Sequence, residues 1–442
     1  MNKYIKFVLS PLIKRIQIEE EKIICEIKNE IRTSTEALQR EFQNVQYSIN
    51  QVPLYSGEKI RILFLFQVAS FWPSMEPLYE ELSKDCRFHT KLLCYDENYD
   101  KTIKTETARQ FLKEKKIPYF TYEEFNIDSF RPHIVFVQTP YDSNRTQRFK
   151  TGFLKSKGYR IIYIPYGIEI SATEHAKRDH FNRDVVLNCW KLYTLSDVMK
   201  KDYFKYCGNA SAVCALGLPR FDALYHSEEY PLANKIKKKA SGRKIVLWKV
   251  HFPKVISEKG KNKLVTPYIE EYIAFAKTLK NYKDLFFIFM PHPRFYEFND
   301  DVNVRKNIKI LIQILKKTEN VYIDTNDDYR NSLIHSQSVI VDRSGVMVEA
   351  GSLGVPVLYM YNPDYKEPLS DAIQPLVNTY YQGKNYKDME LFLHMCQKGE
   401  DPLKSKRSYA FKRCVPYFDG KCSSRIIENI IQSLAYENNI KK

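Results

Sequence analysis

The sequence predicts an α/β protein in which two Rossmann-like domains face a cleft. Two observations carry this prediction. Short apolar runs of strand length alternate with helical segments from about residue 58 onward, which is the pattern of parallel sheets joined by crossover helices. The chain has 442 residues and 44% hydrophobic content, so it exceeds a typical single domain and can form two substantial cores.

Eight strands are expected, in two sets. The first set is Ile60 to Phe66, Lys91 to Cys94, Ile134 to Val137 and Ile161 to Ile164, and the second is Ile245 to Val250, Leu285 to Met290, Val339 to Val341 and Val357 to Met360. Between the sets, Tyr225 to Arg243 is polar and rich in lysine, as connections between domains often are. We therefore expect an N-terminal segment at 1–52, domains at 58–225 and 243–400, and C-terminal helices at 401–442 that pack across both domains.

The stretch from Ser338 to Tyr361 predicts an anion-binding loop. Asp342-Arg343-Ser344-Gly345 breaks a strand directly before a predicted helix from Val346 to Leu353. Backbone N–H groups at the start of a helix are unpaired, and the helix dipole adds roughly half a positive charge there. The loop therefore suits a phosphate, although an ordinary strand–helix–strand unit would show the same pattern.

A second strand ends in Pro291-His292-Pro293-Arg294. The two prolines fix the backbone on either side of His292, so its imidazole is held at the carboxyl end of a strand, where open α/β sheets bind ligands. Arg294 is suited to bidentate phosphate contact. A purely structural histidine is the alternative, and the flanking prolines and the arginine favour function.

The first 50 residues differ from the rest. Apolar residues recur every seven positions at Ile24, Ile31, Leu38 and Val45, which predicts a long amphipathic helix or a short coiled coil. The alternative is a helix that packs on the protein's own domain. Residues 1–15 combine basic and apolar side chains in a run too short to span a bilayer, so we expect neither a transmembrane helix nor a signal peptide, and a position on a membrane surface is consistent with the pattern.

The net charge of +16 suits nucleic acid, an anionic membrane surface or a polyanionic substrate. No nucleic-acid-binding module is recognisable, so nucleic acid is the weakest of the three. Nine cysteines without a C-x-x-C pair suit a reducing cytoplasm. No zinc, EF-hand or H-E-x-x-H spacing is present, so no metal site is expected, and any Mg²⁺ would arrive with a substrate pyrophosphate.

Four segments, in this order along residues 160–430, carry a family resemblance. They are Gly217-Leu218-Pro219-Arg220-Phe221-Asp222, the His292-Pro293 strand end, the loop from Asp342 to Glu349, and Asp419-Gly420-Lys421-Cys422-Ser423-Ser424-Arg425. They resemble the G-x-P-R-x-D, His-Pro, D-Y-S-S-x-x-x-D and D-G-x-x-S-x-R segments of the CDP-glycerol glycerophosphotransferases, which build teichoic-acid and related polyol-phosphate polymers in bacteria. The resemblance implies the two-domain arrangement called GT-B, with the donor held mainly by the second domain.

Two departures from the family pattern are informative. The loop keeps Asp342 and Ser344 but has Gly345 in place of the second serine and Glu349 in place of the last aspartate. The family's Trp-His-Gly, whose histidine is the expected base, appears as Pro165-Tyr166-Gly167. Tyrosine has an ordinary pKa of about 10 and is a poor base at neutral pH. His175 or Glu169 would then transfer the proton, or the acceptor or chemistry would differ.

The resemblance implies transfer of glycerophosphate, or a related alditol phosphate, from a CDP-linked donor to a hydroxyl of a cell-surface polysaccharide or lipid-linked acceptor, at the cytoplasmic face of the membrane. Ser344 and Gly345 are expected to cradle phosphate, with Arg294 and Arg220 as further positive contacts and His292 as a charge or proton partner. Asp342 and Glu349 would order the loop or bind the ribose. A GT-B glycosyltransferase that uses a nucleotide sugar and a catalytically inactive scaffold are the rival hypotheses, and a homo-oligomer through the N-terminal helix is a further expectation.

Overall fold

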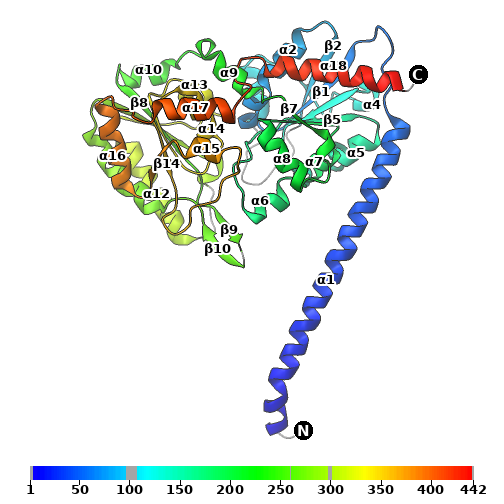
Figure 1. The fold of residues 1–442 in the computed structure, drawn as a ribbon, viewed down its shortest axis with the longest axis horizontal. Coiled ribbons are helices and arrows are strands. Elements are labelled where there is room, and N and C mark those ends of the chain that lie inside the picture. Colours follow the sequence, from blue (N-terminus) through cyan, green and yellow to red (C-terminus); the bar gives the residue numbers. More distant parts are fainter. Residues whose placement is uncertain (1–2, 96–106, 259, 297–300, 441–442) are drawn as a thin grey trace.

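The computed structural model describes residues 3–95, 107–258, 260–296 and 301–440. Two parallel sheets lie side by side, each flanked by helices on both faces (Figure 1). All eight predicted strands are present, with small shifts at their ends. The prediction of two Rossmann-like units is therefore confirmed at the level of the sheets.

The first sheet has seven parallel strands in the order β3-β2-β1-β4-β5-β6-β7. Its strands are β1 (Ile60–Phe66), β2 (Phe88–Cys94), β3 (Phe120–Thr121), β4 (Ile134–Val137), β5 (Arg160–Tyr163), β6 (Lys191–Thr194) and β7 (Val213–Ala215). Its helices are α2 (Glu76–Lys84), α3 (Thr107–Glu114), α4 (Ile127–Phe130), α5 (Thr151–Ser156), α6 (Glu174–Asp179), α7 (Asp184–Asn188) and α8 (Asp197–Tyr206). The central strand β1 reads Ile-Arg-Ile-Leu-Phe-Leu-Phe and is buried at nearly every position, as expected of a strand covered on both faces.

The second sheet has six parallel strands in the order β12-β11-β8-β13-β14-β15. Its strands are β8 (Lys244–Val250), β11 (Leu285–Pro291), β12 (Val321–Ile323), β13 (Ser338–Val341), β14 (Val357–Met360) and β15 (Tyr381–Gly383), with a separate hairpin of β9 (Val255–Glu258) and β10 (Lys261–Leu264). Its helices are α10 (Asn234–Ala240), α11 (Ile269–Thr278), α12 (Val302–Lys317), α13 (Arg330–Ile334), α14 (Val346–Ala350), α15 (Gln374–Val377), α16 (Tyr386–Gln397) and α17 (Lys404–Cys414). Leu247 at the centre of β8 lies opposite Ile288 in β11 and Val339 in β13.

The last helix, α18 (Cys422–Ile440), returns to the first domain (Figure 1). Its apolar side chains Ile426, Ile430 and Leu434 are buried in the same core cluster as β1. Since α17 lies on the second domain, against α15 and the turn after α14, the end of the chain crosses from one domain to the other.

The two domains are tied together directly as well as through the chain. A short antiparallel bridge joins Ser171 of the first domain to Leu369 of the second. Buried Glu76 forms an ion pair with buried Arg330, and Lys115 lies 3.0 Å from a carboxylate oxygen of Asp328. These contacts tie the two domains to each other.

Helix α1 (Lys3–Asn50) runs away from the body of the protein as a single long helix (Figure 1). Its last turns contact the body, chiefly through α5. The sequence-based prediction of a long N-terminal helix is confirmed, and the alternative that it packs along its own domain does not hold for the exposed length.

Candidate functional site

The strand order of the second sheet indicates where a ligand would bind. From β8, the chain order runs one way through β11 and β12 and the other way through β13, β14 and β15. In open α/β sheets, ligands bind at the carboxyl ends of the strands where this order reverses. Three loops meet there, and they begin at His251 after β8, His292 after β11 and Asp342 after β13.

Two histidines lie side by side in this crevice. The ring centroids of His251 and His292 are 4.6 Å apart, and the ring of Phe252 lies 5.0 Å from that of His292. Burial, and next the positive charge of Arg343, lowers the pKa of His251 well below its ordinary value. Burial and the neighbouring imidazole do the same to His292. Both rings are therefore neutral at pH 7.

The hydrogen bonds of the two rings assign opposite tautomers. The Nδ1 of His251 lies 2.8 Å from the carbonyl oxygen of Phe252, which can only accept, so this Nδ1 carries the proton. The Nδ1 of His292 accepts the backbone N–H of Arg294 at 3.1 Å, so the proton of His292 is on Nε2. The pair consequently offers one acceptor, Nε2 of His251, and one donor, Nε2–H of His292.

Positive charge gathers around the histidines. The Arg294 guanidinium lies 4.9 Å above the ring of Phe252. Burial, followed by the charges of Arg343 and Arg294, lowers the pKa of the Lys254 ammonium, and Arg183 of the first domain acts in the same direction. Cations from both domains thus repel one another here, and an anion placed among them would relieve that repulsion.

A buried carboxylate supports the loop behind the histidines. Asp342 accepts the backbone N–H of His251 with both carboxylate oxygens, at 2.8 and 3.1 Å, and the hydroxyl of Tyr272 at 2.8 Å. Burial raises the pKa of Asp342 to about 6 and lowers the pKa of Lys249, next to it in β8, to about 8. Asp342 therefore orders the loop that carries His251.

Ser344 and Gly345 begin a helix shorter than the sequence predicts. The α-helix α14 ends at Ala350, and a 3₁₀ turn continues to Leu353. The Ser344 hydroxyl accepts the backbone N–H of Val346 at 3.3 Å, which satisfies one N–H at the helix start. Gly345 faces the first domain, because a Cβ added to it would lie 3.6 Å from the backbone nitrogen of Ile168.

The candidate residues of the first domain lie on the loop after β5 and on α6. The Tyr166 ring stacks on Phe71 with centroids 4.0 Å apart, and its hydroxyl lies 3.1 Å from that of Tyr141. Glu169 forms a 2.7 Å contact with His180 Nδ1. His175 is half-buried on α6. Glu169 is therefore engaged by a histidine that the sequence analysis did not single out.

Two expected site residues are paired with each other. Arg220 is buried, contacts Glu349 Oε1 at 3.4 Å, and donates to the backbone carbonyls of Pro165 and Tyr166. Glu349 also accepts the hydroxyl of Tyr329. Arg220 thus ties the domains together, and Glu349, at 1% exposure, is buried behind it.

The first and last resemblance segments also meet in space. Asp222 on α9 (Arg220–Tyr225) accepts the backbone N–H groups of Cys422 and Ser423 and the Ser423 hydroxyl, all within 2.8 Å. Gly217 has φ +84°, and a Cβ there would lie 2.5 Å from the Cys422 sulfur. These two segments therefore form the junction where α18 returns to the first domain.

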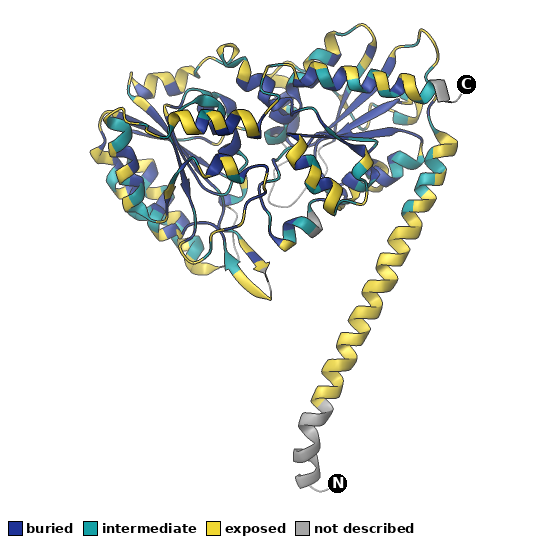
Figure 2. Ribbon diagram, viewed as in Figure 1, coloured by how far each residue is buried: buried dark blue, intermediate teal, exposed yellow. Residues whose placement is uncertain are grey.

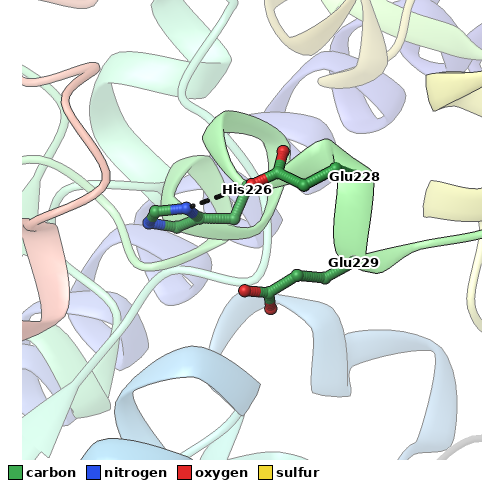
Figure 3. Close-up of side chains that lie close together, drawn as sticks. All are labelled: His226, Glu228 and Glu229. Carbon is green, nitrogen blue, oxygen red and sulfur yellow. Dashed lines mark ion pairs between the residues drawn. The ribbon is translucent and has the colours of Figure 1, made fainter.

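Among the described residues, one group of potential metal ligands comes together, and it lies outside the crevice. His226, Glu228 and Glu229 offer ligand atoms within 4.8 Å of one another, and His226 Nδ1 lies 3.7 Å from Glu228 (Figure 3). The glutamates are exposed, so solvent competes for their oxygens and the group indicates no metal site. Two cavities, of about 450 and 270 Å³, also lie away from the histidines.

Within the described ranges, no helix combines the length and apolar character needed to cross a bilayer. No protein-family model matches the chain, and no curated protein sequence matches it.

Solved structures with the same fold include enzymes of two kinds. A putative UDP-N-acetylglucosamine 2-epimerase from Listeria monocytogenes superposes with TM-score 0.58 and 16% identity over 85% of this chain and 97% of its own. The epimerase from Neisseria meningitidis bound to UDP-GlcNAc gives 0.54 and 17%, over 84% and 100%. A variant of the wall teichoic acid polymerase TagF soaked with CDPG gives 0.58 and 14%, over 92% and 96%. At these identities the likeness establishes the GT-B-like fold, which confirms the predicted fold class.

Proposed function

We propose that the protein is a transferase that takes glycerophosphate, or a related alditol phosphate, from a CDP-linked donor to an acceptor hydroxyl. The observation that carries this proposal is the crevice after β8, β11 and β13, where two neutral imidazoles lie among cations contributed by both domains. A diphosphate is the ligand that best matches such a site, because it brings two adjacent negative groups and several hydrogen-bond acceptors.

The donor diphosphate would lie against Lys254, Arg294 and the Gly345 N–H, with its nucleotide toward the second domain. The acceptor oxygen attacks the β-phosphorus and forms the new P–O bond, while the bond from this phosphorus to the bridging oxygen breaks and CMP leaves with the electron pair. In this assignment His251 Nε2 takes the acceptor proton, and His292 Nε2–H donates a hydrogen bond to the leaving oxygen.

With His251 as the base, no base is needed at the position of Tyr166. The first domain has a tyrosine where the resembling family has its expected base, and the crevice of the second domain supplies an unprotonated imidazole nitrogen at His251. His251 therefore replaces His175 and Glu169 as our preferred base. The two ordered, neutral histidines also argue against the hypothesis of an inactive scaffold, because a protein without catalytic activity does not need them.

The carboxylates near the crevice already have partners. Asp342 is bonded to His251 and Tyr272, and Glu367 holds Arg343 at 2.6 and 3.1 Å. Any Mg²⁺ would on this arrangement arrive bound to the donor diphosphate, and the protein residues would act on the phosphate oxygens directly.

A nucleotide-sugar transferase of the same fold is the second candidate. The observation that favours it is the likeness to proteins that act on or bind UDP-GlcNAc, since the same crevice would hold a UDP diphosphate. For either donor, we propose a cell-surface polysaccharide or lipid-linked acceptor and attachment to the cytoplasmic face of the membrane through residues 1–15, most of whose side chains lie outside the described part of the chain.

The two candidates are separated by incubating the protein with labelled CDP-glycerol, CMP-sugars and UDP-sugars, each with a panel of polyol and saccharide acceptors, and scoring nucleotide release. Release of CMP from CDP-glycerol supports the first candidate, and release from a nucleotide sugar supports the second. No release and no binding of any nucleotide would leave only the scaffold hypothesis.

A further inference from the structure

Helix α1 exposes its apolar residues. Every described side chain from Lys14 to Gln39 is exposed, and the yellow colouring of the projecting helix in Figure 2 shows this directly. Large apolar side chains are exposed at Ile16, Ile18, Ile23, Ile24, Ile27, Ile31, Leu38, Phe42, Val45 and Ile49. A helix of this kind is marginal in water by itself, since most helical stability comes from packing an apolar face.

The root of α1 is held firmly by the body. A Cβ on Gly158 would lie 1.9 Å from the carbonyl oxygen of Asn50, and one on Gly152 would lie 2.5 Å from the Gln43 side chain, so the two glycines allow close approach. The Asn50 side-chain amide donates to the carbonyl of Ser156 at 2.9 Å. The exposed helix is therefore a fixed projection of the first domain with a defined direction.

The central apolar residues form one stripe. At roughly 100° per residue, they fall within about 60° of arc on the helix surface. Six of these residues are Ile24, Ile27, Ile31, Leu38, Phe42 and Val45. The intervals between successive members are the same whether they are counted from the first residue or from the last. Two such stripes can thus pair with either relative direction and bring an apolar residue opposite an apolar residue at each of these positions.

The charged residues of α1 indicate which kind of surface packs against the apolar stripe. Residues 16–31 carry five glutamates, at 19, 20, 21, 26 and 30, and two lysines, at 22 and 28. An anionic membrane surface would repel this segment along its length. The segment from Arg32 to Asn50 carries two arginines and two glutamates, so it has no net charge. Segment 16–31 of another copy can therefore lie beside it without like-charge repulsion.

We propose that the occupant is a second copy of this chain, whose α1 packs against the same stripe in the antiparallel direction. Ile31 of each copy then lies opposite Leu38 of the other, Ile27 opposite Phe42, and Ile24 opposite Val45. A parallel pair would place the acidic segment 16–31 against itself, which costs stability. The antiparallel pair places it beside the balanced segment and sets the two catalytic bodies at opposite ends of a two-helix rod.

The molar mass of the full chain in solution, measured by light scattering over a dilution series, tests the pairing. We expect wild type to be a dimer and Ile31→Glu/Leu38→Glu to be a monomer, because four carboxylates would enter the apolar seam. Asn29→Glu/Thr33→Glu adds the same charges on the opposite face and should remain a dimer. A monomeric wild type, or a stripe variant that remains dimeric, overturns the proposal.

Cysteine crosslinking tests the direction in a Cys25→Ser/Cys86→Ser background, which removes the exposed thiols. Ser34→Cys lies at the centre of the palindrome and should form a disulfide-linked dimer. Leu38→Cys should not, because antiparallel pairing separates the two thiols by about 10 Å along the axis. Efficient crosslinking of Leu38→Cys overturns the antiparallel direction, and failure of Ser34→Cys overturns the seam itself.

Sedimentation with vesicles of phosphatidylcholine and phosphatidylserine distinguishes the seam from a membrane-binding face. The stripe variant should still bind these vesicles, because the proposed membrane contact comes from residues 1–15, which the variant leaves unchanged. Loss of vesicle binding by the stripe variant at unchanged molar mass would assign the stripe to lipid and overturn the proposal.

Discussion

His251 and His292 use their Nδ1 atoms in opposite senses. His251 donates from Nδ1 to the Phe252 carbonyl, whereas His292 accepts the Arg294 backbone N–H at the same atom. With ring centroids 4.6 Å apart, the two neighbouring rings are left with one acceptor nitrogen and one N–H donor. In the proposed mechanism, this asymmetry distinguishes the base, His251, from the hydrogen-bond donor, His292.

Removing the acceptor nitrogen should therefore affect the chemical step more than binding. We expect His251→Gln to lower kcat by about 100-fold or more, with KM for the donor little changed, because general-base catalysis contributes about 10² to 10⁴. His292→Ala should lower kcat by about 100-fold through weaker stabilisation of the leaving oxygen. Steady-state kinetics on folded variants measures both, and near-normal kcat in either would return that histidine to a structural role.

The pH profile of kcat/KM should reflect the lowered pKa of both imidazoles. A base acts in its unprotonated form, so activity is maintained above the pKa of His251 in the folded protein and is lost as the pH falls through it. Because burial lowers that pKa well below the ordinary value, the acid limb due to His251 should lie well below pH 6.5, and an inflection near pH 6 would belong to Asp342, whose pKa burial raises to about 6. An acid limb centred at about 6.5, the ordinary imidazole pKa, would show that the ring is solvated and that the crevice is more open than described.

Loss of one backbone N–H tests the loop after β13. Gly345 has φ −56°, which proline can adopt, so Gly345→Pro removes the N–H with little local strain. Donor binding should weaken by about 1.5 to 3 kcal/mol, the contribution of a hydrogen bond to a charged group. Gly345→Ala keeps the N–H and is the matched control. Equal affinities of the two variants in calorimetric titration would remove this N–H from the site.

The tie between Arg220 and Glu349 should matter for stability and not for donor affinity. Arg220→Met leaves Glu349 buried without its cation, and breaking a buried pair in this way costs about 3 to 5 kcal/mol. The double variant Arg220→Met/Glu349→Leu should recover much of that loss. Urea unfolding of the two variants provides the measurement, and a variant of normal stability that has lost donor binding would restore the phosphate role that the sequence suggested.

The sequence predicted the sheets well because central parallel strands are nearly continuous apolar runs. It missed the short strands β3, β6, β7, β12 and β15, which have between two and four residues. It also missed the hairpin of β9 and β10, whose four-residue strands carry polar side chains. Length and apolar pattern were the signals, so elements weak in both could not be found.

The site was predicted only in part, for a different reason. His292 stood out because prolines flank it, whereas His251 follows Val250 and precedes Phe252 with no such mark. Its one available signal was its place at the end of an apolar run, with Pro253 two residues on. The sequence suggests a phosphate contact for Arg220. It gives no sign of the pairing with Glu349, because Glu349 lies 129 residues away along the chain and the two residues meet only in the folded protein.

In the proposed complex, a diphosphate lies among Lys254, Arg294 and the histidine pair. Equilibrium titration of CDP-glycerol into wild type and Lys254→Ala/Arg294→Ala tests it most directly, with Lys235→Ala/Lys239→Ala on α10 as the control for net charge. Two charge-assisted contacts of about 1.5 to 3 kcal/mol each predict that the crevice variant binds at least about 100-fold more weakly, while the control binds as wild type does. Equal affinity of all three proteins would contradict the claim and place the donor elsewhere.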